Sequence, residues 1–101
     1  MYDHNQTLVP DSFLALYVRH GRPLLDRKEM EARYENAESL AEQIAAVVAS
    51  VPAEDGEGQR EALRSVKASL LVDLLREREP EAGWVVTRVA EMCEWAPPDL
   101  L

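Results

Sequence analysis

The sequence contains a single cysteine, Cys93, among its 101 residues. One thiol excludes an internal disulfide and any zinc site that needs several cysteines. Cys93 has acidic neighbours, and such a setting disfavours the reactive thiolate. We therefore predict a core thiol in a protein of the reducing cytoplasm.

Long apolar runs and positive charge are also scarce. No run approaches the about 20 apolar residues that a membrane-spanning helix needs, and the first residues lack a signal-peptide pattern. Lysine and arginine total 11 against 19 acidic residues, so the net charge is −8. Such a charge repels nucleic acid and anionic membranes and favours a basic partner. We expect no direct binding to DNA, RNA or membrane.

The apolar spacing predicts an all-α fold in one domain, residues 1–101. A polar arm over residues 1–9 precedes a short helix over about 10–19, and a tail over 96–101 ends the chain. Gly21 marks the end of this first helix. The short apolar run before Gly21 also suits a strand, and that alternative stays open.

Three longer helices follow in the predicted order. The second begins at a cap formed by Asp26 with Glu29, and its apolar seam consists of Met30, Tyr34, Ala37, Ala41, Ile44 and Val48. After a loop over 50–58, the third helix spans about 59–78. Its apolar side consists of Leu63, Val66, Leu70 and Leu74. The fourth helix spans 80–95, with a stripe of Val85, Val89 and Met92.

Two long helices joined by a short loop predict an antiparallel hairpin. We expect a small helical bundle in which the short N-terminal helix and the C-terminal helix cover this hairpin. Glu31, Glu35, Glu38 and Glu42 form an acidic row on the second helix, and Arg60, Arg64 and Lys67 form a basic row on the third. Folding the hairpin predicts two ion pairs, Lys67 with Glu42 and Arg78 with Glu31.

The stretch LYVRHG, residues 16–21, is similar to the motif in which histidine phosphatases carry their phosphorylated histidine. That family also needs a second, distant histidine, two arginines and an acidic proton donor. Here the other histidine is His4, which lies upstream, and the family's α/β domain is much longer than this chain. We instead place Arg19 and His20 in the last turn of the first helix, with Gly21 as its cap. A phosphoryl-transfer enzyme using His20 is the less favoured alternative.

Other catalytic or ligand-binding patterns are not met either. The stretch DGEG lacks the lysine of a phosphate-binding loop and the ligand order of a calcium loop. The acidic row lacks the histidines that accompany glutamates in dimetal helical bundles. We therefore predict no catalytic residue, no cofactor and no metal.

Two tryptophans suggest an interaction surface. Trp84, Arg88 and Trp95 recur at helical spacing on one side of the fourth helix, and tryptophan and arginine are favoured interface anchors. Between Arg33 and Arg60 there is no basic residue, which makes the chain's acidity asymmetric. The candidate partner-binding residues are Glu35, Glu38, Glu42, Trp84, Arg88 and Trp95. That both rings merely cover the small core stays an alternative.

A resemblance to known proteins rests on several stretches of the sequence. They are the opening MYD and NQT, VPDSFLALY, the pair Gly21-Arg22 and EAGWVVTRVAEM. The chain resembles short uncharacterised bacterial proteins that are often labelled "ATPase with chaperone activity". The label implies nucleotide binding, for which this sequence lacks a phosphate-binding lysine. At most, the resemblance implies a bacterial cytoplasmic accessory protein.

These observations favour a small, acidic, non-enzymatic protein that binds a protein partner. Charge would steer the encounter, and apolar anchors would supply affinity. A nucleic-acid-mimicking inhibitor of a basic protein would show the same acidic face. A homodimer also stays open, because a short helical chain gains core by pairing.

Overall fold

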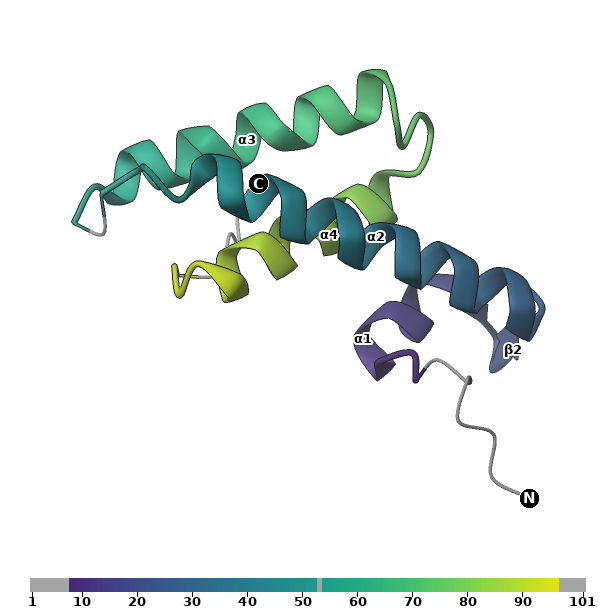
Figure 1. Ribbon diagram of the computed structural model, residues 1–101. Helices are drawn as coiled ribbons and strands as arrows, with labels where there is room; N and C mark the ends of the chain where they lie inside the picture. Colours follow the sequence, from purple (N-terminus) through teal and green to yellow (C-terminus); the bar gives the residue numbers. More distant parts are fainter. Residues whose placement is uncertain (1–7, 53, 97–101) are drawn as a thin grey trace.

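In the computed structural model, residues 8–52 and 54–96 are described, and they form α-helices with one small β-hairpin (Figure 1). The elements are α1 (Asp11–Leu14), a 3-10 turn (Ala15–Tyr17), β1 (Val18–Arg19), β2 (Arg22–Pro23), α2 (Arg27–Val48), α3 (Gly56–Val72) and α4 (Glu79–Met92). The expectation of a mostly helical protein is confirmed. Most of the predicted polar arm and of the predicted tail lies outside the described residues.

The predicted short helix over about 10–19 is wrong around the Arg-His-Gly motif, where the alternative of a strand is the one that forms. Instead of continuing to residue 19, α1 ends at Leu14, and the chain forms an antiparallel hairpin in which Arg19 pairs with Arg22. His20 and Gly21 occupy the two-residue turn with φ values of 53° and 77°. Two successive positive φ values match the twist of the flanking strands, and glycine adopts them without steric cost. Gly21 therefore serves a hairpin turn, not a helix cap.

The second helix matches its prediction closely. Asp26 caps α2, because its carboxylate accepts a hydrogen bond from the backbone N–H of Glu29 at 2.8 Å. Such a cap satisfies an N–H that has no partner within the helix. The predicted seam faces the core: Met30, Ala37, Ala41 and Val48 are buried, and Tyr34 and Ile44 are half-buried.

The ends of α3 and α4 differ from the prediction. The third helix starts earlier, at Gly56, because Asp55 caps it through the N–H of Gly58 at 2.9 Å. It stops at Val72, and the following turn places Leu75 in the core. The fourth helix stops at Met92 and does not reach Trp95. Burial of Leu75 outweighs the local helical pattern that continues beyond Val72.

The centre of the molecule is α4, which packs against both α2 and α3. Contact between α2 and α3 is smaller than either of these, although the two helices run side by side in opposite directions (Figure 1). Five apolar residues of α4 are buried: Ala82, Val85, Val86, Val89 and Ala90. The C-terminal helix therefore fills the space between α2 and α3, where the prediction had it covering a closed hairpin.

The predicted ion pairs across the hairpin are also wrong. Lys67 Nζ lies 3.8 Å from Glu79 Oε1, and Glu31 Oε2 lies 3.1 Å from Arg27 Nε. Lys67 therefore pairs with a glutamate at the start of α4 instead of Glu42, and Glu31 pairs with an arginine of its own helix instead of Arg78. The central position of α4 separates the acidic row of α2 from the basic row of α3.

Candidate protein-interaction surfaces

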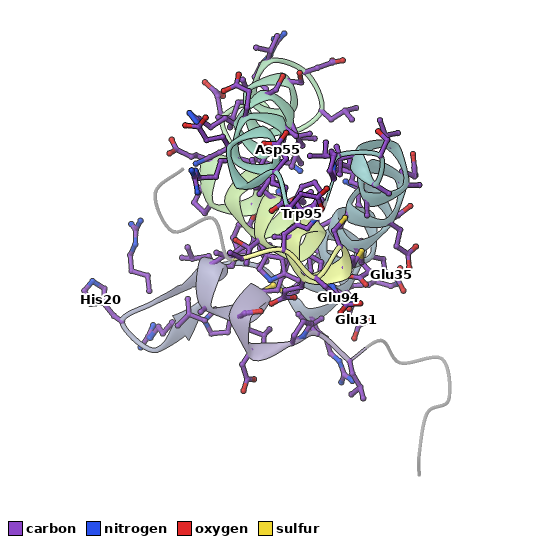
Figure 2. All side chains as sticks on the ribbon, turned by 90° about the vertical axis from the view of Figure 1, so that its left-hand side faces the viewer. His20, Glu31, Glu35, Asp55, Glu94 and Trp95 are labelled. Atoms are coloured by element: carbon purple, nitrogen blue, oxygen red, sulfur yellow. The ribbon has the colours of Figure 1, made fainter. Side chains whose placement is uncertain are left out.

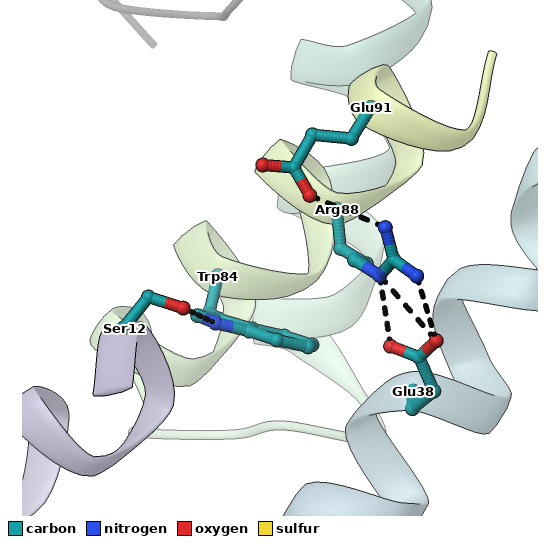
Figure 3. Close-up of polar contacts among 5 residues, drawn as sticks. All are labelled: Ser12, Glu38, Trp84, Arg88 and Glu91. Atoms are coloured by element: carbon teal, nitrogen blue, oxygen red, sulfur yellow. Dashed lines mark hydrogen bonds and ion pairs between the residues drawn. The ribbon is translucent and has the colours of Figure 1, made fainter. Parts of the chain in front are cut away.

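A charged network joins α2 to α4 (Figure 3). Arg88 Nε lies 3.0 Å from Glu38 Oε1, and Arg88 Nη2 lies 3.1 Å from Glu38 Oε2. Arg88 Nη1 also donates to Glu91 Oε1 at 3.3 Å. Hydrogen bonding to Glu38 raises the pKa of the Arg88 guanidinium and so holds its charge. Two of the predicted partner-binding residues, Glu38 and Arg88, thus bind each other.

Trp84 belongs to an aromatic cluster under α1. Its ring meets Phe13 edge-on with centroids 5.2 Å apart, and it meets Tyr34 in the same manner at 5.8 Å. Its indole N–H donates to Ser12 Oγ at 3.0 Å (Figure 3). The half-buried ring therefore fastens α1 to α4. The second tryptophan, Trp95, lies past the end of α4, so the two do not share one continuous helix face.

An open cleft of about 400 Å³ borders this network. It lies between α1, α3 and α4, and Trp84, Thr87 and Arg88 line it together with Lys67. The ion pair of Lys67 with Glu79 and that of Arg88 with Glu38 neutralise most of its charge. Trp84 and Arg88 thus keep an accessible side, although their main contacts are internal.

The acidic row of α2 forms a second surface. Figure 2 shows Glu31 and Glu35 on the side of α2 that faces away from α3. Glu42 continues the row, and it is exposed. The basic residues Arg60 and Arg64 are exposed on α3, and Arg64 Nη1 lies 3.7 Å from Glu61 Oε2. The acidic row of α2 therefore has no basic counterpart on α3, because Arg60 and Arg64 share their surface with Glu57 and Glu61.

The sequence analysis did not predict a third surface, because its parts lie on different helices. A groove of about 430 Å³ separates the C-terminal half of α2 from α3. Its apolar lining consists of Leu40, Ile44, Val47, Val48, Val66, Leu70 and Leu74. The side chains of Val47 and Leu74 are unusually open to solvent for their type, at 76% and 62% exposure. The signal in the sequence was that Leu40 and Val47 are apolar at positions outside the predicted seam.

A buried carboxylate anchors the N-terminal segment. Glu81 is fully buried in the first turn of α4, where Tyr17 donates a hydrogen bond to its Oε1 and Arg33 Nη1 lies 3.9 Å away. Burial, followed by the hydrogen bond to Glu81, raises the pKa of the Tyr17 hydroxyl. These contacts tie the 3-10 turn to α2 and α4. They belong to the packing of the fold.

His20 and Cys93, the two residues whose chemistry the sequence analysis considered, line neither the cleft nor the groove. His20 is exposed in the hairpin turn, and Figure 2 shows it projecting from that turn. Burial raises the pKa of the Cys93 thiol, whose sulfur lies 3.9 Å from the carbonyl oxygen of Ala45.

Over residues 8–52 and 54–96, His, Cys, Asp and Glu side chains do not gather in groups of three that would hold a metal ion. None of the helices in this part of the chain combines the length and the apolar character needed to cross a membrane.

Comparison with known proteins found no family model, no curated protein and no solved structure that matches this chain. The resemblance to the short bacterial proteins therefore stays a prediction.

Proposed function

We propose that this chain is a non-enzymatic interaction protein that binds a basic protein surface through the acidic row of α2. The observation that carries the proposal is the position of this row. Figure 2 shows Glu31 and Glu35 of this row on the side of α2 that faces away from α3, and Glu35 and Glu42 are exposed. A partner with a basic surface would be steered to this edge by the field of a chain whose net charge is −8.

The network around Glu38 gives this surface a rigid border. Because Arg88 holds the Glu38 carboxylate through three hydrogen bonds, that part of the row is pre-organised. The accessible sides of Trp84 and Arg88 line the neighbouring cleft, where they supply the apolar and planar contacts that anchor interfaces. Trp95 is half-buried beyond the end of α4, and the proposed surface includes it as a further apolar contact.

The test is salt-dependent capture from a native lysate by the immobilised full chain. We expect a basic protein to bind at about 50 mM salt and to be released at about 500 mM, because screening weakens attraction between exposed charges. Replacing Glu35→Lys together with Glu42→Lys should abolish capture. The matched control, Glu57→Lys with Glu61→Lys, applies the same charge change to α3 and should preserve it.

Capture that survives both the row variant and high salt would contradict the proposal. If the captured protein binds DNA, competition with a DNA duplex distinguishes a nucleic-acid mimic from an ordinary partner. In the case of a mimic, the duplex and this chain exclude each other from the same basic groove.

A further inference from the structure

We propose that the tip of the hairpin formed by β1 and β2 binds a short acidic segment of a partner protein. The segment carries two neighbouring carboxylates and an apolar side chain beside them. This site goes beyond the proposed function, because it takes a ligand of the opposite charge on another side of the molecule. Figure 2 shows His20, at the tip of the hairpin, on the opposite side of the view from Glu31 and Glu35.

Positive charge is concentrated around this hairpin. Residues 19–28 contain four of the chain's 11 lysine and arginine residues but only one of its 19 acidic residues. That acidic residue is Asp26, whose carboxylate is engaged in the cap of α2. All four basic residues, Arg19, Arg22, Arg27 and Lys28, are exposed. In a chain whose net charge is −8, this stretch forms a local positive pole.

The register of the hairpin places two positive charges side by side. Arg19 lies directly opposite Arg22, and like charges in that position destabilise a strand pair. Among residues 8–52 and 54–96, none of the ion pairs includes either arginine. A guanidinium group binds a carboxylate through two parallel hydrogen bonds. A ligand that brings a carboxylate to each arginine therefore removes the repulsion.

The turn between the arginines holds a residue that the turn itself does not require. His20 occupies the first of the two turn positions, with a φ of 53°. Turns with two positive φ values favour asparagine, aspartate or glycine at this position. The imidazole ring keeps at least one N–H donor in either protonation state. The tip therefore presents a third hydrogen-bond donor between the two arginines.

An apolar side chain continues the face that carries the arginines. The N–H of Leu24 donates to the carbonyl oxygen of Tyr17 at 2.7 Å, so the strand pairing extends beyond Pro23. Side chains two residues apart on a strand share a face, which places Leu24 beside Arg22. The Leu24 side chain is 53% exposed. A peptide with an acidic residue and, two positions later, an apolar residue matches this spacing, whereas a small inorganic anion leaves Leu24 uncovered.

The charge of the whole molecule selects a short ligand. Attraction between exposed charges is largely screened beyond about 8 Å at physiological ionic strength. A segment with two carboxylates therefore interacts with the tip alone. A DNA duplex or an anionic membrane is much larger than the tip, and the rest of this acidic chain repels it.

A titration of the full, 15N-labelled chain with the peptide acetyl-Glu-Ser-Glu-Ser-Leu-amide tests the site. At about 20 mM salt we expect a dissociation constant of about 1 mM. The largest shifts in the NMR spectrum should be those of the Nε–H groups of Arg19 and Arg22. The peptide with glutamine in place of both glutamates should not bind. The peptide with alanine in place of leucine should bind about threefold more weakly.

Two double variants of equal charge test the role of the arginines. Arg19→Gln with Arg22→Gln should weaken peptide binding by about tenfold or more, because both carboxylates lose their partners. The matched control is Arg76→Gln with Arg78→Gln, which removes two other exposed arginines that have no printed role in the hairpin. It should change the affinity by less than about twofold. Unchanged shifts in α2 and α4 verify that both variants fold.

A change in the turn separates binding from folding. His20→Asn should keep the hairpin, because asparagine suits the turn, and should weaken peptide binding by about twofold to threefold. An affinity equal to that of the wild type would remove His20 from the site. The charge reversal Glu35→Lys with Glu42→Lys should not weaken peptide binding, so this site and the proposed function can fail independently.

Three results would overturn the inference. The first is the absence of shifts at about 10 mM peptide. The second is an equal loss of binding in the two double arginine variants, which would indicate a general attraction to positive charge. The third is binding of phosphatidylserine vesicles or of a DNA duplex through Arg19 and Arg22 that is tighter than binding of the peptide.

Discussion

Glu38 and Arg88 were predicted as partner contacts, and in the structure they bind each other. Helical spacing placed both on exposed flanks and made them candidate partner contacts. The structure brings them together from α2 and α4 with three hydrogen bonds. Nothing local to either helix indicates this pair, because it depends on which face of α2 receives α4. Their internal pairing makes them positioning residues for the neighbouring surface.

Glu38 and Glu91 both bind Arg88, and we expect them to contribute unequally to the free energy of unfolding. Glu38→Gln should lower the free energy of unfolding by about 1 kcal/mol, because it removes the bidentate ion pair that joins two helices. Glu91→Gln should lower it by no more than about 0.3 kcal/mol, since that pair is single, exposed and within one helix. Urea unfolding monitored by circular dichroism measures both. Equal effects would show that the cross-helix geometry adds nothing.

At the scale of single elements, the predicted cap of α2 is confirmed, whereas the predicted start of α3 and the predicted ends of α3 and α4 are wrong. Asp26 and Asp55 each cap a helix within three residues of their own position, so such starts depend on short-range hydrogen bonds. The ends of α3 and α4 depend on burial of residues further along, such as Leu75. The Arg-His-Gly turn was interpreted as a helix end because glycine with positive φ serves both structures.

The cap of α3 makes glycine necessary at one helical position. Alanine normally stabilises a helix interior relative to glycine by up to about 1 kcal/mol. A Cβ at Gly58 would collide with the carboxylate of Asp55, whereas one at Gly83 meets nothing within 4 Å. We therefore expect Gly83→Ala to raise the melting temperature and Gly58→Ala to lower it.

The double variant Asp55→Ala with Gly58→Ala tests the cause of this difference. Without the capping carboxylate, the alanine at position 58 should become stabilising relative to Asp55→Ala alone. If Gly58→Ala remains destabilising in that background, the collision with Asp55 is not the reason.

At the scale of the whole molecule, Phe13 joins parts of the chain that are far apart in sequence. Its ring is buried against Tyr17, Tyr34 and Trp84, with centroids between 5.2 and 5.8 Å away. An isolated α1 of four residues would not be stable. The aromatic cluster, not the helix, therefore holds the N-terminal segment on α2 and α4.

Removing this ring should affect the entire fold. Phe13→Ala is expected to cost about 3–5 kcal/mol, a large share of the about 5–15 kcal/mol that stabilises a typical domain. Tryptophan fluorescence during urea unfolding is the measurement, because Trp84 contacts the ring. The control Leu8→Ala changes a side chain that is 79% exposed and should shift stability by less than about 0.5 kcal/mol. A similarly small effect at Phe13 would mean that α1 contributes little to the core.

The sequence by itself determined the mostly helical character, the cap and seam of α2, and the acidic and basic rows. These features depend on periodicity and on hydrogen bonds between near neighbours, which are local properties. Only the tertiary structure decided that α4 is central, that Glu38 pairs with Arg88, that Trp84 packs under α1, and that a groove lies open between α2 and α3. Each of these depends on which faces of distant helices meet. Several pairings of amphipathic helices satisfy the same pattern, and the burial of the whole set selects among them.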